Sequence, residues 1–274
     1  MNIPSTPAFC IIAPTAYLDQ YATQSNRHLV LAHLVDRDQV YADFYKRMRA
    51  RGDYIIMDNS AFELLTPYSP DKLVSLAERC GAHAVVLPDY PFQPASKTID
   101  AAREFIPKFK QAGLHTFFVP QSEVGQLEDW IFSYKWAAQN PDIDIIGMSI
   151  LGIPNALPHI PPAYARVVMT QLLIDRCVFN KRKYHHFLGL NAGPALEIPP
   201  LLRMEALSSC DSSNPVWMGI LGHEYSYNTD SYLPVKKAKM EVDFDFHWIK
   251  DQNTHHRIQT NVGMALNLFN DSTN

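Results

Sequence analysis

The sequence predicts an α/β fold, a (β/α)8 barrel of the TIM type with parallel strands. Short apolar runs that end in a polar residue recur eight times along the chain, and a helix-like stretch follows most of them. Several runs, such as YIIMD and IDIIGMS, are nearly continuous in β-branched, aromatic or other apolar residues, which is typical of strands buried on both faces of a parallel sheet. The length of 274 residues suits one barrel of about 250 residues.

The expected strands cover residues 9–13, 28–33, 54–58, 84–89, 115–121, 143–149, 185–190 and 206–211. Apolar residues at helical spacing predict helices over 70–81, 96–113, 125–139 and 163–179, and we expect Pro107 to break or kink the second of these. Alternation of strand and helix indicates βαβ units with right-handed crossovers. Eight such units favour a closed barrel over an open doubly wound sheet.

One domain is expected over residues 1–274, with the barrel at about 8–213 and a C-terminal extension at about 214–274. The extension ends in a predicted helix over 255–269. The four cysteines lie far apart and form no CxxC pair, so we expect neither a zinc subdomain nor a disulfide scaffold. Reduced thiols of this kind favour a cytoplasmic location.

Composition excludes several classes of protein. Hydrophobic residues make up 47% and charged residues 19%, which rules out a disordered chain, a collagen-like fibre and a coiled-coil rod. No apolar run reaches the roughly 18 residues of a membrane span. No basic residue precedes the short apolar run near the N-terminus, so we do not expect a secretory signal. The net charge of −4 means that any nucleic-acid partner would have to be held by a local basic patch.

Polar side chains end five of the expected strands: Asp58, Asp89, Gln121, Ser149 and Asp211. In a barrel these ends converge on one mouth, where chemistry takes place. Two carboxylates beside a sugar suit glycosidic chemistry, and a third carboxylate with an amide could bind the edge of a nucleobase. The alternative for any single aspartate is a helix cap or a loop hydrogen bond. His185 and His186 begin their run, so we expect them at the opposite rim.

These runs, in this order, resemble the tRNA-guanine transglycosylase superfamily. The resemblance covers roughly residues 8 to 213, and its motifs are Asp58-Asn-Ser-Ala-Phe62, Val85-Val-Leu-Pro-Asp89, Val119-Pro-Gln121, Ile145-Ile-Gly-Met-Ser149, Phe187-Leu-Gly-Leu190 and Ser209-Cys-Asp211-Ser-Ser213. Each motif alone is weak evidence for this superfamily, and the set of motifs in this order is more specific.

The resemblance implies a glycosyltransferase that exchanges guanine for a 7-deazaguanine, such as preQ0, on an intact nucleic-acid strand. It implies that Asp211 is the nucleophile and Asp58 the proton carrier. Asp89, Gln121, Gly147 and Met148 would bind the base edge. Phe62 would stack on the base, with barrel packing as the alternative, and Leu188 would close the other face. For this chain we expect no cofactor and no metal.

The chain departs from the family pattern in ways that favour one branch. Ser60-Ala61 and Ser122-Glu123 replace glycine pairs, and the Cys-rich zinc site of the tRNA enzymes has no counterpart. A short, zinc-less chain is most like the viral (phage) transglycosylases that act on DNA. The alternatives are a tRNA-modifying member, a barrel that binds nucleic acid or a base without turnover, and an unrelated barrel hydrolase or lyase.

Basic clusters are the candidates for contact with nucleic-acid phosphates, although such clusters are often only solvated surface. They comprise Lys181, Arg182, Lys183, Lys236, Lys237, Lys239 and the segment 255–257.

Overall fold

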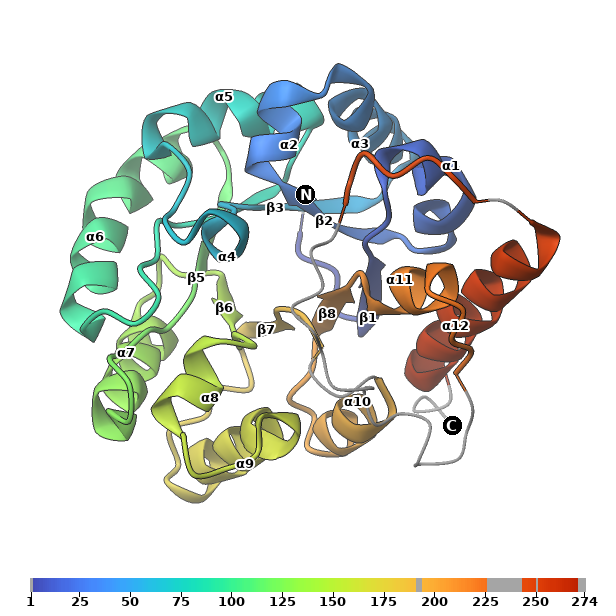
Figure 1. Cartoon of the computed structure of the whole chain (residues 1–274). Helices are drawn as coiled ribbons and strands as arrows, with labels where there is room; N and C mark the ends of the chain where they lie inside the picture. The colour runs from blue at the N-terminus through green and yellow to red at the C-terminus, as the bar shows by residue number, and fades with distance from the viewer. Residues whose placement is uncertain (1, 191–193, 226–242, 250, 271–274) are drawn as a thin grey trace.

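The protein is a nearly closed barrel of eight parallel strands (Figure 1). The structure, a computed structural model, describes residues 2–190, 194–225, 243–249 and 251–270. The strands are paired in the order β1-β8-β7-β6-β5-β4-β3-β2. Their bounds are β1 Ala8–Ile11, β2 Arg27–Leu31, β3 Tyr54–Asp58, β4 Ala84–Val86, β5 His115–Phe118, β6 Ile145–Gly147, β7 Tyr184–Phe187 and β8 Ser209–Ser212. The predicted (β/α)8 fold is confirmed, and all eight expected runs contain a strand.

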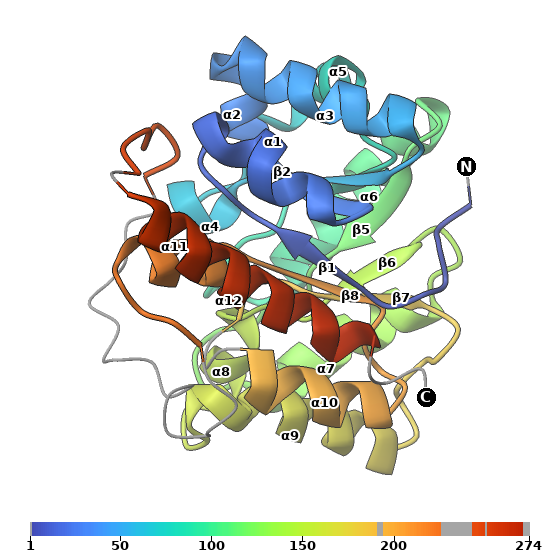
Figure 2. The same ribbon diagram turned by 90° about the vertical axis from the view of Figure 1, so that its right-hand side faces the viewer.

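An outer ring of helices covers the strands (Figure 1). Its longer members are α3 Gln39–Arg51, α5 Pro70–Cys80, α6 Ala95–Gln111, α7 Leu127–Gln139, α9 Pro162–Asp175 and α10 Pro194–Arg203. Short elements fill the connections: 3-10 turns at Thr15–Tyr17 and Ala22–Gln24, α1 Leu18–Tyr21, α2 Ala32–Arg37, α4 Ala61–Leu64, α8 Gly152–Ala156 and α11 Asn214–Ile220. In the extension, α12 Gln252–Asn270 packs on α11, α10 and β1, as Figure 2 shows.

The predicted helices over 70–81, 96–113, 125–139, 163–179 and 255–269 correspond to α5, α6, α7, α9 and α12, with ends shifted by a few residues. Of the two outcomes expected at Pro107, a break or a kink, the break is wrong, because α6 runs through this residue. Proline removes only one intrahelical hydrogen bond, the one to Arg103. Burial of Ile106 and Phe109 against the barrel holds the helix together across that position.

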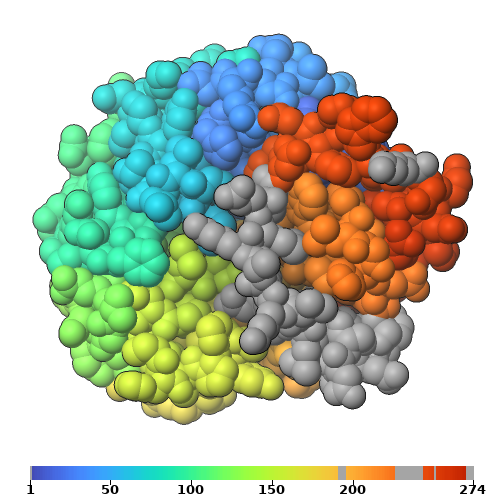
Figure 3. Space-filling view, in the orientation of Figure 1, coloured from blue at the N-terminus to red at the C-terminus, as the bar shows by residue number. Residues whose placement is uncertain are grey.

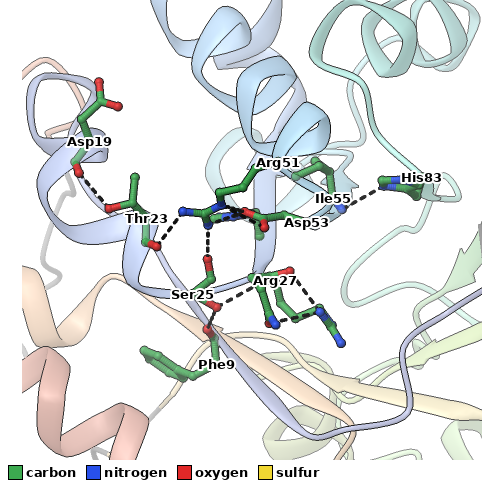
Figure 4. A network of polar contacts seen from close by, with 11 residues as sticks. Phe9, Asp19, Thr23, Ser25, Arg27, Arg51, Asp53, Ile55 and His83 are labelled. Atoms are coloured by element: carbon green, nitrogen blue, oxygen red, sulfur yellow. Dashed lines mark hydrogen bonds and ion pairs between the residues drawn. The ribbon is translucent and has the colours of Figure 1, made fainter.

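A polar network links the barrel where the strand ladder ends, between β1 and β2 (Figure 4). Arg51 donates to the Asp53 carboxylate and to the carbonyl oxygens of Thr23, at 2.9 Å, and Ser25, at 2.6 Å. The Ser25 hydroxyl donates to the Phe9 carbonyl oxygen of β1 at 2.6 Å. These bonds tie together the N-terminal ends of β1, β2 and β3.

No helix in the described part of the chain is both long and apolar enough to cross a membrane. The four cysteines are free, and only Cys177 is exposed.

Candidate active site at the carboxyl ends of the strands

Three aspartates gather at the end of the barrel where the strands terminate. Asp58 is the last residue of β3, Asp89 follows β4, and Asp211 lies in the second half of β8. All three side chains are buried. The charges of Asp89 and Asp211 both act on Asp58 and raise its pKa, so the three groups share one region. Figure 3 views this end, with the segments that contain α4, α8 and α11 around the centre.

Asp58 lies where a carboxylate is poorly solvated. Burial raises its pKa well above the usual value, and repulsion from Glu63, Asp89 and Asp211 raises it further. The backbone N–H of Ser60 donates to Asp58 Oδ2 at 2.8 Å and opposes this shift only in part. Asp58 is therefore suited to carry a proton near neutral pH.

Glu63, on α4, is a fourth carboxylate that the sequence motifs did not single out. The surrounding protein displaces water from it and raises its pKa to about 7, and repulsion from Asp211 adds to the effect. The residue is nevertheless exposed to solvent. The shift follows from the tertiary neighbourhood, so no local sequence signal could have indicated it.

Asp89 is held between two amides. Asn59 Nδ2 donates to Oδ1 at 2.7 Å and Gln121 Nε2 donates to Oδ2 at 2.7 Å. Burial outweighs these bonds and raises the pKa of Asp89 to about 6. The Gln121 Oε1 atom is buried and accepts no hydrogen bond from the described residues. Asn59, which lies next to Asp58 in the sequence, also donates to the Leu87 carbonyl oxygen at 2.8 Å.

Asp211 accepts two hydrogen bonds on one oxygen. His186 Nε2 lies 3.0 Å from Oδ1, and the backbone N–H of Gly189 donates to the same atom at 3.0 Å. Because an ionised carboxylate can only accept, His186 Nε2 carries a proton in this contact. In the neutral imidazole, Nδ1 then accepts from the Ser209 hydroxyl, at 2.6 Å. Among the described residues, Oδ2 of Asp211 has no such partner.

The prediction that His185 and His186 face the opposite rim is wrong. Strand β7 has only four residues, so His186 is already level with Gly147 on β6 and Ser209 on β8. Its side chain points into the barrel beneath Asp211, whereas His185 points outward and contacts Tyr134 Oη at 2.9 Å. The sequence pattern did not indicate how short this strand is, and the length of the strand decides where the two histidines lie.

The remaining base-binding candidates differ in whether they are free to contact a base. The Met148 N–H donates to the His186 carbonyl oxygen at 2.8 Å, so the expectation that this amide meets the base is wrong. Gly147 has no space for a side chain, because a Cβ would lie 2.7 Å from Phe117 and 3.1 Å from Leu188. Phe62, on α4, is 56% exposed, which removes barrel packing as its role and leaves its ring free to contact a ligand.

Ser149 caps the start of the following turn. Its hydroxyl oxygen accepts from the N–H groups of Leu151 and Gly152, both at 3.1 Å. Ser149 therefore makes a loop hydrogen bond of the kind that was the alternative for the aspartates.

The cluster 181–183 lies away from the carboxylates. It precedes β7 and therefore lies at the N-terminal end of the barrel. Lys181 pairs with Glu205 at 2.7 Å, and Lys183 Nζ donates to the carbonyl oxygens of Asn140 and Ile143. Their position therefore does not support the expectation that Lys181, Arg182 and Lys183 contact the phosphates of a nucleic acid bound at the carboxylates. Lys236, Lys237 and Lys239 lie outside the described residues.

The segment 255–257 is engaged within the protein. His255 Nδ1 lies 2.6 Å from Tyr21 Oη, and Arg257 donates to Thr254 Oγ1 at 2.7 Å.

A cavity of about 540 Å³ lies at the N-terminal end of the barrel. It is lined by Lys46, Arg49, His83 and His115 among others, and it contains none of the three aspartates. Within the described ranges, no group of three or more His, Cys, Asp or Glu side chains could hold a metal ion.

A comparison with protein-family models finds no match, and a comparison with curated proteins also finds none.

Proposed function

We propose that this chain is a base-exchange transglycosylase that replaces guanine with a 7-deazaguanine in DNA through a covalent aspartyl intermediate. The observation that carries the proposal is the grouping of three buried aspartates in three different environments. Asp58 tends to hold a proton, Asp89 is flanked by amides, and Asp211 keeps one oxygen free of described partners. A glycosyl exchange needs these three roles: a proton carrier, a base acceptor and a nucleophile.

In the first half of the reaction, Asp211 Oδ2 attacks C1′ of the target nucleoside. The C1′–N9 bond breaks, and guanine leaves with a proton from Asp58, so that the sugar is esterified to Asp211. In the second half, Asp58 removes the N9 proton of the incoming base. N9 then attacks C1′, and the Asp211 carboxylate is released. Covalent catalysis divides the exchange into two steps and leaves the phosphodiester backbone intact.

Base recognition falls to Asp89 and Gln121. Each oxygen of the ionised Asp89 accepts one amide hydrogen and has a lone pair left, so the pair can accept the N1–H and 2-amino groups of a guanine-like base. The second hydrogen on Gln121 Nε2 can donate to O6. The exposed ring of Phe62 supplies a stacking surface, and the base must leave its helix stack to reach it.

DNA is favoured over tRNA because the residues that follow Asp211 include no counterpart of the Cys-rich motif of the tRNA enzymes. A barrel that binds a base without turnover would have Asp211 turned away from the other acids. The influence of the Asp211 charge on Asp58 and Glu63 argues against that alternative.

The test is to incubate the protein with labelled guanine and either single-stranded DNA, duplex DNA or tRNA. A second set of incubations contains unlabelled preQ0 in place of the guanine. The nucleosides are identified by mass after digestion of the nucleic acid. We expect label and preQ0 to enter DNA, with Asp211→Asn inactive. Incorporation into tRNA alone would favour the tRNA alternative. Release of guanine without incorporation would indicate a hydrolase, and no reaction with any substrate would contradict the proposal.

A further inference from the structure

Arg166 is an internal arginine of α9 whose guanidinium is fully buried. It lies behind the two connections that follow β6 and β7. Nη1 donates to the carbonyl oxygens of Met148, at 3.1 Å, and Leu188, at 2.8 Å, and Nη2 donates to that of Gly189, at 2.6 Å. One side chain therefore holds the backbone at the ends of two neighbouring strands.

The charge of Arg166 is balanced by Glu197 of α10. Arg166 Nε donates to Oε1 at 2.8 Å and Nη2 donates to Oε2, and both side chains are completely shielded from solvent. Removing two charges from water is costly, and well-packed apolar residues often replace such a pair without loss of stability. An apolar pair could join α9 to α10, but it could not bind three carbonyl oxygens. The carbonyl contacts are therefore the distinctive property of this pair.

The contact with Leu188 reaches Asp211 through a single peptide group. The Leu188 C=O and the Gly189 N–H belong to the same planar unit, which is trans, so they point in opposite directions. Arg166 donates to its oxygen on one side, and its N–H donates to Asp211 Oδ1 at 3.0 Å on the other. A cation bound to the oxygen polarises the peptide and strengthens its N–H as a donor.

The same peptide is restrained by packing. Gly189 has a φ of +69°, and a Cβ there would lie 3.1 Å from Ile150 Cδ1. The turn thus needs glycine in a left-handed conformation. Arg166 binds the carbonyl oxygen of Gly189 and also that of the preceding residue, Leu188.

We propose that Arg166 is a positioning residue for the Asp211 nucleophile. It orients and polarises the Leu188–Gly189 peptide, which holds Oδ1 of Asp211 and leaves Oδ2 directed at the sugar. The catalytic consequence of this inference rests on the proposed function. The structural consequence, a Gly189 amide whose hydrogen bond depends on Arg166, does not.

The kinetic experiment uses the double variant Arg166→Met/Glu197→Met, which removes both charges and retains volume. We expect kcat for base exchange to fall about 10- to 100-fold, with KM for the base changed less than threefold. The acidic limb of the kcat–pH profile should move to higher pH, because the Gly189 N–H becomes a weaker donor to the Asp211 carboxylate. Arg176→Met/Glu128→Met removes an exposed pair between the residue that follows α9 and α7, and it serves as the control, with kcat unchanged. An unaltered kcat and pH profile in the buried-pair variant would overturn the inference.

The second experiment does not depend on activity. Labelling leucine carbonyl carbons and glycine nitrogens selects the three Leu-Gly pairs of the sequence, at 151–152, 188–189 and 221–222. Asp211→Asn identifies the Gly189 amide signal by shifting it. We expect the same signal to move upfield in Arg166→Met/Glu197→Met and to stay in the Arg176 control. A signal that responds to Asp211→Asn but not to the double variant would refute the role of Arg166, whether or not the wild-type protein exchanges bases.

Discussion

His186 bridges two successive inward-facing residues of β8, since its Nε2 lies 3.0 Å from Asp211 Oδ1 and its Nδ1 lies 2.6 Å from Ser209 Oγ. The imidazole is completely buried, so it has no water with which to exchange these bonds. It therefore fixes the rotation of the Asp211 carboxylate from below, while the Gly189 N–H fixes it from the side.

The first prediction concerns this contact. His186→Phe keeps the ring volume but removes both hydrogen bonds, so Asp211 loses one of its two donors. We expect kcat for base exchange to fall about 10- to 100-fold and the free energy of unfolding to fall by about 1–3 kcal/mol, because Ser209 is left without its partner. Steady-state kinetics and urea unfolding measure the two effects. His185→Phe, on the outward face of the same strand, is the control for kcat. Equal kcat values for the two variants would show that His186 does not support Asp211.

The second prediction tests the nucleophile. Asp211→Asn retains the size of the side chain and an oxygen that accepts from Gly189, but amide oxygen is a poor nucleophile. We expect exchange to fall by at least about 10³-fold, and no covalent protein–DNA adduct should be trapped on a denaturing gel. Asp175→Asn, on the surface of α9, is the matched control. Exchange by Asp211→Asn at a rate near that of the wild type would remove Asp211 from its assigned role.

The third prediction links base binding to the titration of Asp89. The pKa of this carboxyl is raised to about 6 by burial, and only the ionised form accepts both N–H groups of a guanine-like base. Affinity for free 7-deazaguanine should therefore rise with pH and level off above 6, with about tenfold weaker binding at pH 5 than at pH 7.5. Isothermal titration calorimetry at the two pH values measures this difference.

The matched variant is Asp89→Ala. It should bind the base more weakly at pH 7.5 while its unfolding transition changes little, since the variant also loses a costly buried charge. If Asp89→Ala bound the base as tightly as the wild type, Asp89 would have no part in recognition.

The fourth prediction concerns acid stability and His185. Burial lowers the pKa of His185 to about 3, so the side chain stays neutral in the folded state while the unfolded chain gains a proton below about 6.5. The unfolded state then binds more protons, and the contribution of His185 to stability is complete above 6.5 and is lost as pH falls towards 3. His185→Phe removes this dependence.

The comparison of the two proteins isolates that one group. Between pH 7.5 and pH 5, the wild type should lose about 2 kcal/mol more unfolding free energy than His185→Phe. Other titrating groups cancel in the difference. If urea unfolding showed the same loss of unfolding free energy between pH 7.5 and pH 5 for the two proteins, His185 would be protonated in the folded protein.

The sequence by itself determined the barrel and the end at which its acids meet. Runs such as 54–58 and 143–149 are apolar because helices cover one face of each strand and the other face lines the barrel interior. Burial on both faces therefore leaves a signal in the sequence itself. Asp58, Asp89, Gln121 and Asp211 follow or close such runs, so parallel strands bring them to one end whatever the details of packing.

Tertiary structure decided which groups support these acids and how they are charged. Strand register placed His186 under Asp211, and the packing of α9 against two strand ends gave Arg166 its three carbonyl oxygens. Burial of Ile106 and Phe109 against the barrel carried α6 through Pro107. Register, burial and long-range contacts depend on residues far apart in the chain, so no local pattern contains them. The raised pKa values of Asp58 and Glu63 belong to this second class, because desolvation exists only once the barrel has formed.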